Sequence, residues 1–212
     1  MKQTVKLPSK IPVFPLSNFI IFPETTVPLN IFEPRYIQMI DDVMKGDRII
    51  GMIQPKEKIS DPELYKIGCA GKITSFHETD DGRYLIILVG ICRFKILNEI
   101  SSNHLYRNCE VTYNNFIEDT KKQSHNIKFS DLKLIFKNLK TLFDRQGYSI
   151  NWKEVEKQKL DQTINTLSMA SPFSLEEKQI LLETIGLDDR KKKLEEIIKT
   201  YLYDNYSNNT IQ

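Results

Sequence analysis

The segment Gly68-Cys69-Ala70-Gly71-Lys72-Ile73 comes closest in this sequence to a phosphate-binding loop. Such a loop needs a glycine five residues before the Gly-Lys pair and a hydroxyl residue after the lysine, because its backbone N–H groups face phosphate and the hydroxyl ligates magnesium. Position 66 is lysine, position 73 is isoleucine, and the residues that follow are typical of a strand. The glycines therefore indicate features of a sheet, and no nucleotide site is predicted.

Cysteine and histidine are the remaining residue types that could act as nucleophiles or metal ligands. No CxxC pair occurs and the number of cysteines is odd, which argues against a disulfide framework or zinc ribbon and leaves only a mixed Cys/His site assembled in space. No GxSxG motif occurs either. We therefore predict no catalytic residue, no cofactor and no metal, and expect the cysteines to be small buried side chains. The cysteines of the chain are Cys69, Cys92 and Cys109, and its histidines are His77, His104 and His125.

Charge is nearly balanced, with 30 Lys and Arg against 28 Asp and Glu, for a formal net charge of +2. Duplex-DNA-binding proteins usually carry a stronger basic footprint, so the balance argues against nucleic acid as a partner. The densest basic run, Arg190-Lys191-Lys192-Lys193, is followed by Glu195 and Glu196 on the same predicted helix. This pattern predicts a solvated helix face.

The most unusual local pattern is Phe32-Glu33-Pro34-Arg35-Tyr36, in which aromatic and oppositely charged residues flank a proline. Proline suits the first position of a helix, and a helix start presents unpaired N–H groups and positive potential. In a structural interpretation, Glu33 and Arg35 pair or satisfy backbone groups, while Phe32 and Tyr36 fix the helix to a barrel. In a functional interpretation, this corner offers part of a groove for an extended peptide. The two are not exclusive.

The composition of the sequence changes near residue 120, which divides the elements that must position this corner from those that follow. Before it, prolines and glycines separate β-branched and aromatic runs, and after it Lys, Glu, Leu and Ile recur with helical spacing. We expect an α+β chain in which a closed or nearly closed β barrel precedes a block of helices. Asp81-Gly82 predicts a hairpin turn, Gly90 a bulge or bend, and Gly46 the end of the helix that Pro34 begins. The expected strands are Ile11–Leu16, Thr26–Phe32, Arg48–Gln54, Lys66–His77, Arg83–Ile100 and Leu105–Phe116.

About four helices are expected in the second part. Apolar residues from Leu132 to Phe143 recur at i, i+3, i+4 and i+7, which is typical of an amphipathic helix, and Gly147 is placed to end it. Asn151 with Glu154, and Ser174 with Glu177, have capping-box spacing. The last helix buries Leu187, Leu194, Ile197, Ile198, Tyr201 and Leu202.

The predicted organisation is a barrel subdomain over residues 1–118, a linker over 119–127, a helical bundle over 128–206 and a flexible tail over 207–212. The longest apolar run, Leu85 to Cys92, is far shorter than the roughly 20 residues that span a bilayer. Prolines at positions 8, 12 and 15 interrupt the first segment, so no signal peptide is predicted. We expect a cytoplasmic protein with no membrane partner.

Three blocks of sequence, found in the expected order, resemble one known family. The first is Ile11-Pro12-Val13-Phe14-Pro15-Leu16 with Phe22-Pro23 and the run from Val27 to Tyr36. The second is Asp81-Gly82-Arg83-Tyr84 with the run from Val89 to Ile96, and the third is Leu167-Ser168-Met169-Ala170 with the run from Leu175 to Glu183. Together they resemble the N-terminal domain of the Lon protease family, in its stand-alone form.

This resemblance implies a PUA-like β barrel of about six strands with one inserted helix, followed by a helical bundle. In the full protease, this region helps to recognise unfolded or tagged substrates and supports hexamer assembly. The chain has neither the ATPase phosphate loop nor the serine–lysine protease domain of that enzyme.

We therefore predict a non-catalytic module that binds unfolded or extended polypeptide segments, alone or beside a chaperone or protease. The expected peptide contacts are Phe32, Glu33, Arg35, Tyr36 and Gln38. An RNA-binding PUA-like module is the alternative, and a hydrolase acting on its own is a third hypothesis.

Overall fold

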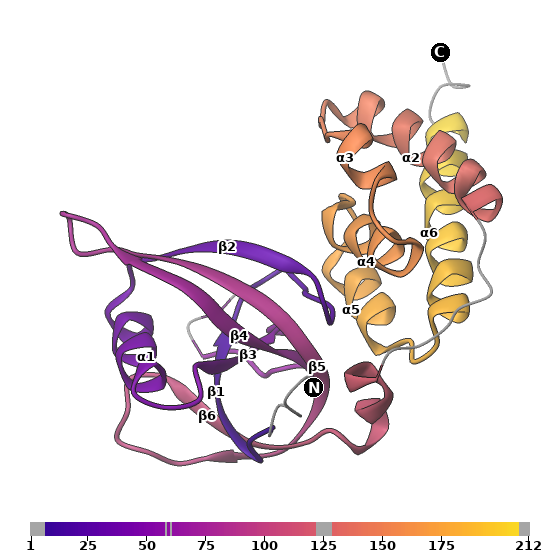
Figure 1. The fold of residues 1–212 in the computed structure, drawn as a ribbon. Helices are drawn as coiled ribbons and strands as arrows, with labels where there is room; N and C mark the ends of the chain where they lie inside the picture. The colour runs from indigo at the N-terminus through magenta and orange to yellow at the C-terminus, as the bar shows by residue number, and fades with distance from the viewer. Residues whose placement is uncertain (1–6, 58, 60, 122–128, 208–212) are drawn as a thin grey trace. The chain divides into compact units, whose positions relative to one another are not determined.

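A computed structural model describes residues 7–57, 59, 61–121 and 129–207 of the chain. The chain falls into two compact units, Met1–Lys122 and Gln123–Gln212, and each is described by itself (Figure 1). Within the described residues, no helix is both long and apolar enough to cross a bilayer.

In its described residues, the first unit contains one sheet of six strands in the order β2-β5-β4-β3-β1-β6, and β6 pairs with β5 as well (Figure 1). Because β6 returns to β5, strands β5, β4, β3, β1 and β6 close into a ring, whereas β2 pairs, among the described residues, with β5 alone. The β1–β3 pair is parallel and the other pairs are antiparallel. The strands are β1 Lys10–Pro15, β2 Thr26–Ile31, β3 Ile49–Ile53, β4 Ile67–Glu78, β5 Tyr84–Ile100 and β6 Arg107–Thr112.

All six predicted strands and the predicted α+β class are confirmed, with one large difference at the end of β6. The sequence predicted a strand to Phe116, but β6 ends at Thr112 and a short 3-10 helix, η1 (Asn114–Thr120), follows. Phe116 is 4% exposed and belongs to the cluster that fills the ring. The short helix η1 therefore returns this apolar side chain to the core, whereas a continued strand would carry the chain past it. The other members of this cluster include Ile11, Val13, Ile49, Ile53, Ala70, Cys92, Phe94, Ile96, Cys109 and Val111.

Two glycines in and beside β5 behave as predicted. Gly82 has a φ of 77°, the left-handed conformation that the β4–β5 hairpin turn requires. At Gly90 the register of β4 and β5 shifts between Ala70 and Gly71, and a Cβ at Gly90 would overlap the carbonyl oxygen of Phe22. Only glycine therefore allows the segment before β2 to pass this close to the bend in β5.

The helix inserted into the sheet, α1, spans Pro34–Met44. The prediction that Gly46 ends it is wrong, because Lys45 is the C-cap and keeps a right-handed conformation. The amides of Gly46 and Arg48 both donate to the Val43 carbonyl, at 3.0 and 3.1 Å, and Arg48 adopts the left-handed φ of 60°. The left-handed residue that closes the turn thus lies two positions later than expected.

In its described residues, the second unit contains five α-helices, where about four were predicted. The stretch after Asn151 divides into two helices, because residues 157–159 interrupt it. Gly147 ends the first helix in a left-handed conformation, and Ser174 and Glu177 form the predicted reciprocal capping box. The helices are α2 Lys133–Gln146, α3 Trp152–Glu156, α4 Leu160–Ala170, α5 Leu175–Glu183 and α6 Leu187–Ser207, and a short 3-10 helix, η2 (Phe129–Leu132), precedes them.

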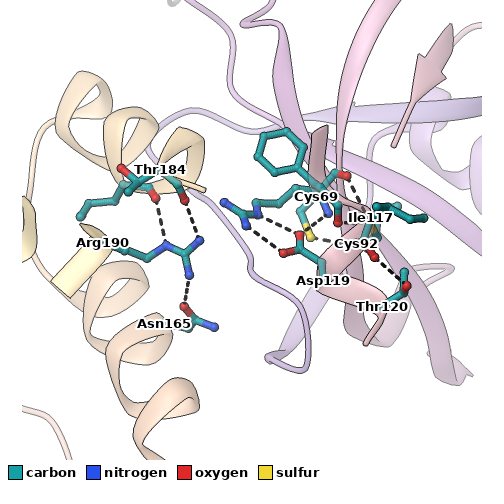
Figure 2. A network of polar contacts seen from close by, with 12 residues as sticks. Cys69, Cys92, Ile117, Asp119, Thr120, Asn165, Thr184 and Arg190 are labelled. Carbon is teal, nitrogen blue, oxygen red and sulfur yellow. Dashed lines mark hydrogen bonds and ion pairs between the residues drawn. The ribbon is translucent and has the colours of Figure 1, made fainter. Parts of the chain in front are cut away.

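Arg190 corrects the prediction of a wholly solvated basic run at the start of α6. This residue is only 4% exposed, and its guanidinium donates to Asn165 Oδ1 at 2.7 Å and to the carbonyls of Leu181 and Thr184 at 3.1 and 2.9 Å (Figure 2). The carbonyls at the end of a helix lack partners within the helix, and the fork of guanidinium donors satisfies two of them here. Arg190 therefore joins α4, α5 and α6.

A buried ion pair fastens η1 to β5. The carboxylate of Asp119 accepts hydrogen bonds from the Arg93 backbone N–H at 3.0 Å and from its Nε and Nη2 atoms at 2.8 Å each. The Asp119 and Arg93 side chains are 10% and 3% exposed, and the guanidinium lies 4.4 Å from the centre of the Phe116 ring. Asp119 and Thr120 were predicted to lie in a linker but belong to η1. The rest of that linker from residue 122, and the tail from residue 208, lie outside the described residues.

Candidate polypeptide-binding surface

The corner between β2 and α1 is built by the chain reversal that Pro34 allows. Glu33 is the N-cap residue and is extended, with φ −73° and ψ 133°, and its carbonyl accepts from the amides of Tyr36 and Ile37 at 2.9 and 3.0 Å. Pro34 then occupies the first turn, where no N–H donor is needed. The Glu33 side chain makes no capping bond and so remains available to a neighbouring cation.

Glu33 and Arg35 pair with each other, as the structural interpretation predicted. Oε2 of Glu33 lies 2.9 Å from Nε and 2.7 Å from Nη2 of Arg35. Both side chains are nearly half exposed, and the guanidinium lies 4.6 Å from the centre of the Tyr36 ring. An exposed pair of this kind contributes only about 0–1 kcal/mol to stability, so a partner molecule can displace it at low cost.

Tyr36 and Gln38 hold α1 in place. Tyr36 is 5% exposed, its ring centre lies 4.2 Å from that of Phe14, and its burial raises the pKa of the phenol. Gln38 Oε1 accepts the Leu105 backbone N–H at 2.8 Å. Of the five predicted contact residues, these two are therefore engaged inside the unit.

Phe32 differs from the structural interpretation, which expected it to anchor the helix. Its side chain is 64% exposed, although it lies beside the buried Ile31. Side chains alternate between the two faces of a strand, so the buried Val27 and Ile31 place Thr26, Pro28 and Asn30 of β2 on the outer face of the sheet. Phe32 continues this outward series just beyond the end of the strand.

β5 extends the same outer face beside Phe32 and Pro28. Pro28 pairs with Ile87, and the neighbouring pair is Asn30 with Leu85, so these side chains share one face. Leu85 is 44% exposed and Ile87 and Val89 are half-buried, whereas the alternate residues Tyr84, Ile86 and Leu88 are buried. We name the set Pro28, Phe32, Leu85, Ile87 and Val89 the outer apolar strip.

The strip could not be identified from the sequence. The run from Leu85 to Cys92 is apolar without interruption, so its pattern does not reveal which alternate side chains point inward. The register with β2 and β4 settles this, and register depends on residues far away in the chain. Phe32 is the member of the strip that the sequence pattern did predict as a peptide contact.

The three thiols are poorly placed for chemistry, and the prediction that they are small buried side chains is confirmed. Burial raises the pKa of the Cys92 thiol to about 12 and that of Cys109 to about 11, and it raises the pKa of the fully buried Cys69 as well. The nucleophilic form of a cysteine is the thiolate, which is scarce at neutral pH when the pKa is this high. Among the described residues, no group of three or more His, Cys, Asp and Glu side chains is arranged to hold a metal ion.

A comparison with protein families identifies the family of the chain. The model of the substrate-binding domain of ATP-dependent protease La (Lon) matches residues 10–200. The chain belongs to this family. The match covers both units, so the barrel and the helices together form the Lon substrate-binding domain.

Lon proteases from bacteria are similar to the chain over nearly its whole length. That of Desulfosudis oleivorans is 28% identical over 197 residues, which cover 90% of this chain and 24% of the relative. That of Flavobacterium johnsoniae is also 28% identical, over 195 residues, covering 87% of this chain and 23% of the relative. The chain thus spans about a quarter of the length of these proteases.

Two solved structures share the fold. The Lon N-terminal domain protein from Xanthomonas campestris has a TM-score of 0.63 and 20% identity, with 88% of this chain and 97% of that chain covered. The N-terminal domain of Mycobacterium avium complex Lon protease has a TM-score of 0.60 and 18% identity, with 90% and 98% covered. At this identity, the likeness shows the fold alone.

Proposed function

We propose that this Lon substrate-binding domain is a non-catalytic module that binds unfolded or extended polypeptide segments, alone or beside a chaperone or protease in the cytoplasm. Phe32 carries the proposal, because its 64% exposed ring lies at the end of the outer apolar strip and next to the Glu33–Arg35 pair. Membership of a substrate-binding family supports a polypeptide as the ligand.

The surface suits a polypeptide better than a small molecule. The outer apolar strip is an open sheet face and offers apolar contact over several side chains, whereas small-molecule sites are concave. An exposed apolar surface favours ligands with apolar side chains of their own, which folded proteins bury and unfolded segments expose. Arg35 can add a contact to a peptide carboxylate by leaving Glu33. Binding is expected to be weak, because the flexible ligand loses conformational entropy.

Non-catalytic function is part of the same proposal. The high pKa values of the thiols support it, since a cysteine nucleophile requires a thiolate. The RNA-binding alternative is less well supported, because Arg190, in the densest basic run, is buried.

An NMR titration with casein, an unfolded polypeptide, tests the proposal. We expect amide shifts at Phe32, Leu85 and Ile87, and we expect Phe32→Ser and Leu85→Ser each to weaken binding several-fold. Leu97→Ser is the matched control, because Leu97 is 48% exposed on the same strand but lies outside the strip. The proposal fails if millimolar casein produces no shifts, or if the control weakens binding as much as the strip variants.

A further inference from the structure

β2 is an edge strand with one side open. Every strand of the ring has at least two strand neighbours, whereas β2, within the part of the chain that the structure describes, pairs with β5 alone. The edge strand of a sheet presents a row of unpaired backbone N–H and C=O groups, which another extended chain can match. Thr26, Pro28 and Asn30 on this strand are all exposed.

The direction of the backbone groups in β2 follows from the bonds at its start. The Gly90 amide donates to the Thr25 carbonyl at 2.9 Å, so Thr25 faces β5. In an antiparallel ladder alternate residues face the partner, and Val27, Leu29 and Ile31 therefore face β5 as well. Thr26, Pro28 and Asn30 turn their backbone groups towards the open edge.

Pro28 supports the same assignment independently. Proline has no N–H to contribute to a ladder, and within sheets it is confined to positions where the N–H would face away from the partner strand. The open edge of β2 therefore offers the carbonyls of residues 26, 28 and 30 but only two donors, the amides of Thr26 and Asn30. Proline at this position also limits unwanted pairing between edges.

The second open edge of the same sheet is less suitable. β3 pairs with β4 only as far as Lys72. Within the described residues, positions 74–78 of β4 therefore have a strand neighbour, β5, on one side only. The register between β4 and β5 shifts between Ile73 and Ser75, and an irregularity of this kind bends the strand that would have to accept a partner there. β2 has an uninterrupted register from Thr26 to Ile31.

We propose that an extended polypeptide segment adds to the open edge of β2 as a further antiparallel or parallel strand. This inference rests on the proposed polypeptide-binding function and specifies how the ligand binds. The unpaired donors and acceptors of β2 fit the backbone of any extended segment, which gives binding with little dependence on sequence.

The side chains of the added strand set a preference for alternating apolar residues. Those on its outer face lie beside Pro28 and continue the outer apolar strip towards Phe32. Those on its inner face lie beside Leu29, which is only half-buried although it belongs to the inner face. The ligand class is therefore an extended segment with apolar side chains at alternate positions.

Amide hydrogen exchange on the full chain with casein tests this mode. We expect casein to slow exchange at Thr26 and Asn30, the two outward amides. Asn30→Pro removes one of these donors and should weaken binding about two- to tenfold, whereas Pro28→Val adds a donor and should strengthen binding by a similar factor. Asn30→Ala keeps the outward N–H and should therefore weaken binding less than Asn30→Pro. Leu97→Ser, outside both the open edge and the outer apolar strip, is the control and should leave affinity within twofold.

The outcomes separate this inference from the proposed function. Shifts at Phe32, Leu85 and Ile87 without slower exchange at Thr26 and Asn30 would overturn strand addition and leave polypeptide binding standing. Weaker binding by Pro28→Val would also overturn it. Because Pro28→Val is read out independently, the test stays decisive even if Asn30→Pro fails to fold. The absence of any casein binding would overturn both.

Discussion

The buried pair of Arg93 and Asp119 allows a sharp test of what stabilises the first unit. Asp119→Asn keeps the shape of the side chain but removes the charge that faces the guanidinium. With side chains only 3% and 10% exposed, the pair belongs to the buried class, in which the loss of one partner costs about 3–5 kcal/mol. An exposed pair would contribute about 0–1 kcal/mol, so the two cases are well separated.

The assay is urea unfolding of the full chain followed by amide signals of β5 and η1. Trp152, the only tryptophan, lies in the second unit, so its fluorescence gives a separate signal from that unit. We expect Asp119→Asn to lower the free energy of unfolding of the first unit by about 3–5 kcal/mol. Amides of η1 should exchange faster, because the carboxylate also binds the Arg93 backbone N–H.

Two further variants serve as controls for this test. Glu118→Gln is the control, since Glu118 is 58% exposed and pairs with the exposed Lys121, and it should change stability by no more than about 1 kcal/mol. The double variant Arg93→Met with Asp119→Leu should be less destabilising than Asp119→Asn, because no buried charge is left without its counter-charge. A loss below about 1 kcal/mol in Asp119→Asn would refute the reasoning.

Three other perturbations have defined outcomes. Gly90→Ala should lower the free energy of unfolding by about 1–3 kcal/mol or more in a denaturant titration, because its Cβ overlaps the Phe22 carbonyl oxygen. Cys92 should resist iodoacetamide at pH 8 in the native chain and react once urea unfolds it, because burial raises its pKa to about 12. Burial and the hydrogen bond to Glu177 raise the pKa of Tyr201 to about 12. The contribution of the protonated phenol to the free energy of unfolding is therefore complete below the ordinary pKa of 10.0 and should be lost as pH rises towards 12. Amide exchange in α6 measures this loss.

Each of these perturbations has its own contradicting result. Gly46→Ala is the control for Gly90→Ala, because the nearest atom to its Cβ is 3.9 Å away, and equal losses in the two variants would contradict the overlap argument. Rapid alkylation of Cys92 without urea would contradict its burial. Tyr201→Phe should remove the alkaline effect, and an unchanged pH dependence in this variant would assign the effect to another group.

Local signals in the sequence were sufficient for most of the elements. Gly82 and Gly147 lie at left-handed positions, and Ser174 with Glu177 forms a capping box, because each of these depends on residues within four positions. The end of α1 was misplaced at Gly46, since a right-handed Lys45 and a left-handed Arg48 close the turn equally well.

Features that depend on distant residues could not be predicted. Arg190 is buried because Asn165, 25 positions away, offers an acceptor, and no local pattern encodes this. At the candidate surface, the sequence drew attention to the corner, but Tyr36 is engaged by Phe14 and Gln38 by Leu105. The open edge of β2 follows from the return of β6 to β5, which only the complete set of pairings reveals.

The order of pairing also constrains how the chain is synthesised. In the described part of the chain, β2 has its only strand partner in β5. β1 needs β6 as its second neighbour, so the ring cannot close before Thr112 has left the ribosome. Until then, the nascent chain exposes apolar side chains such as Val13 and Ile31, which the completed unit buries. During this interval of translation the domain is itself an unfolded polypeptide, and its exposed apolar side chains make it prone to aggregation.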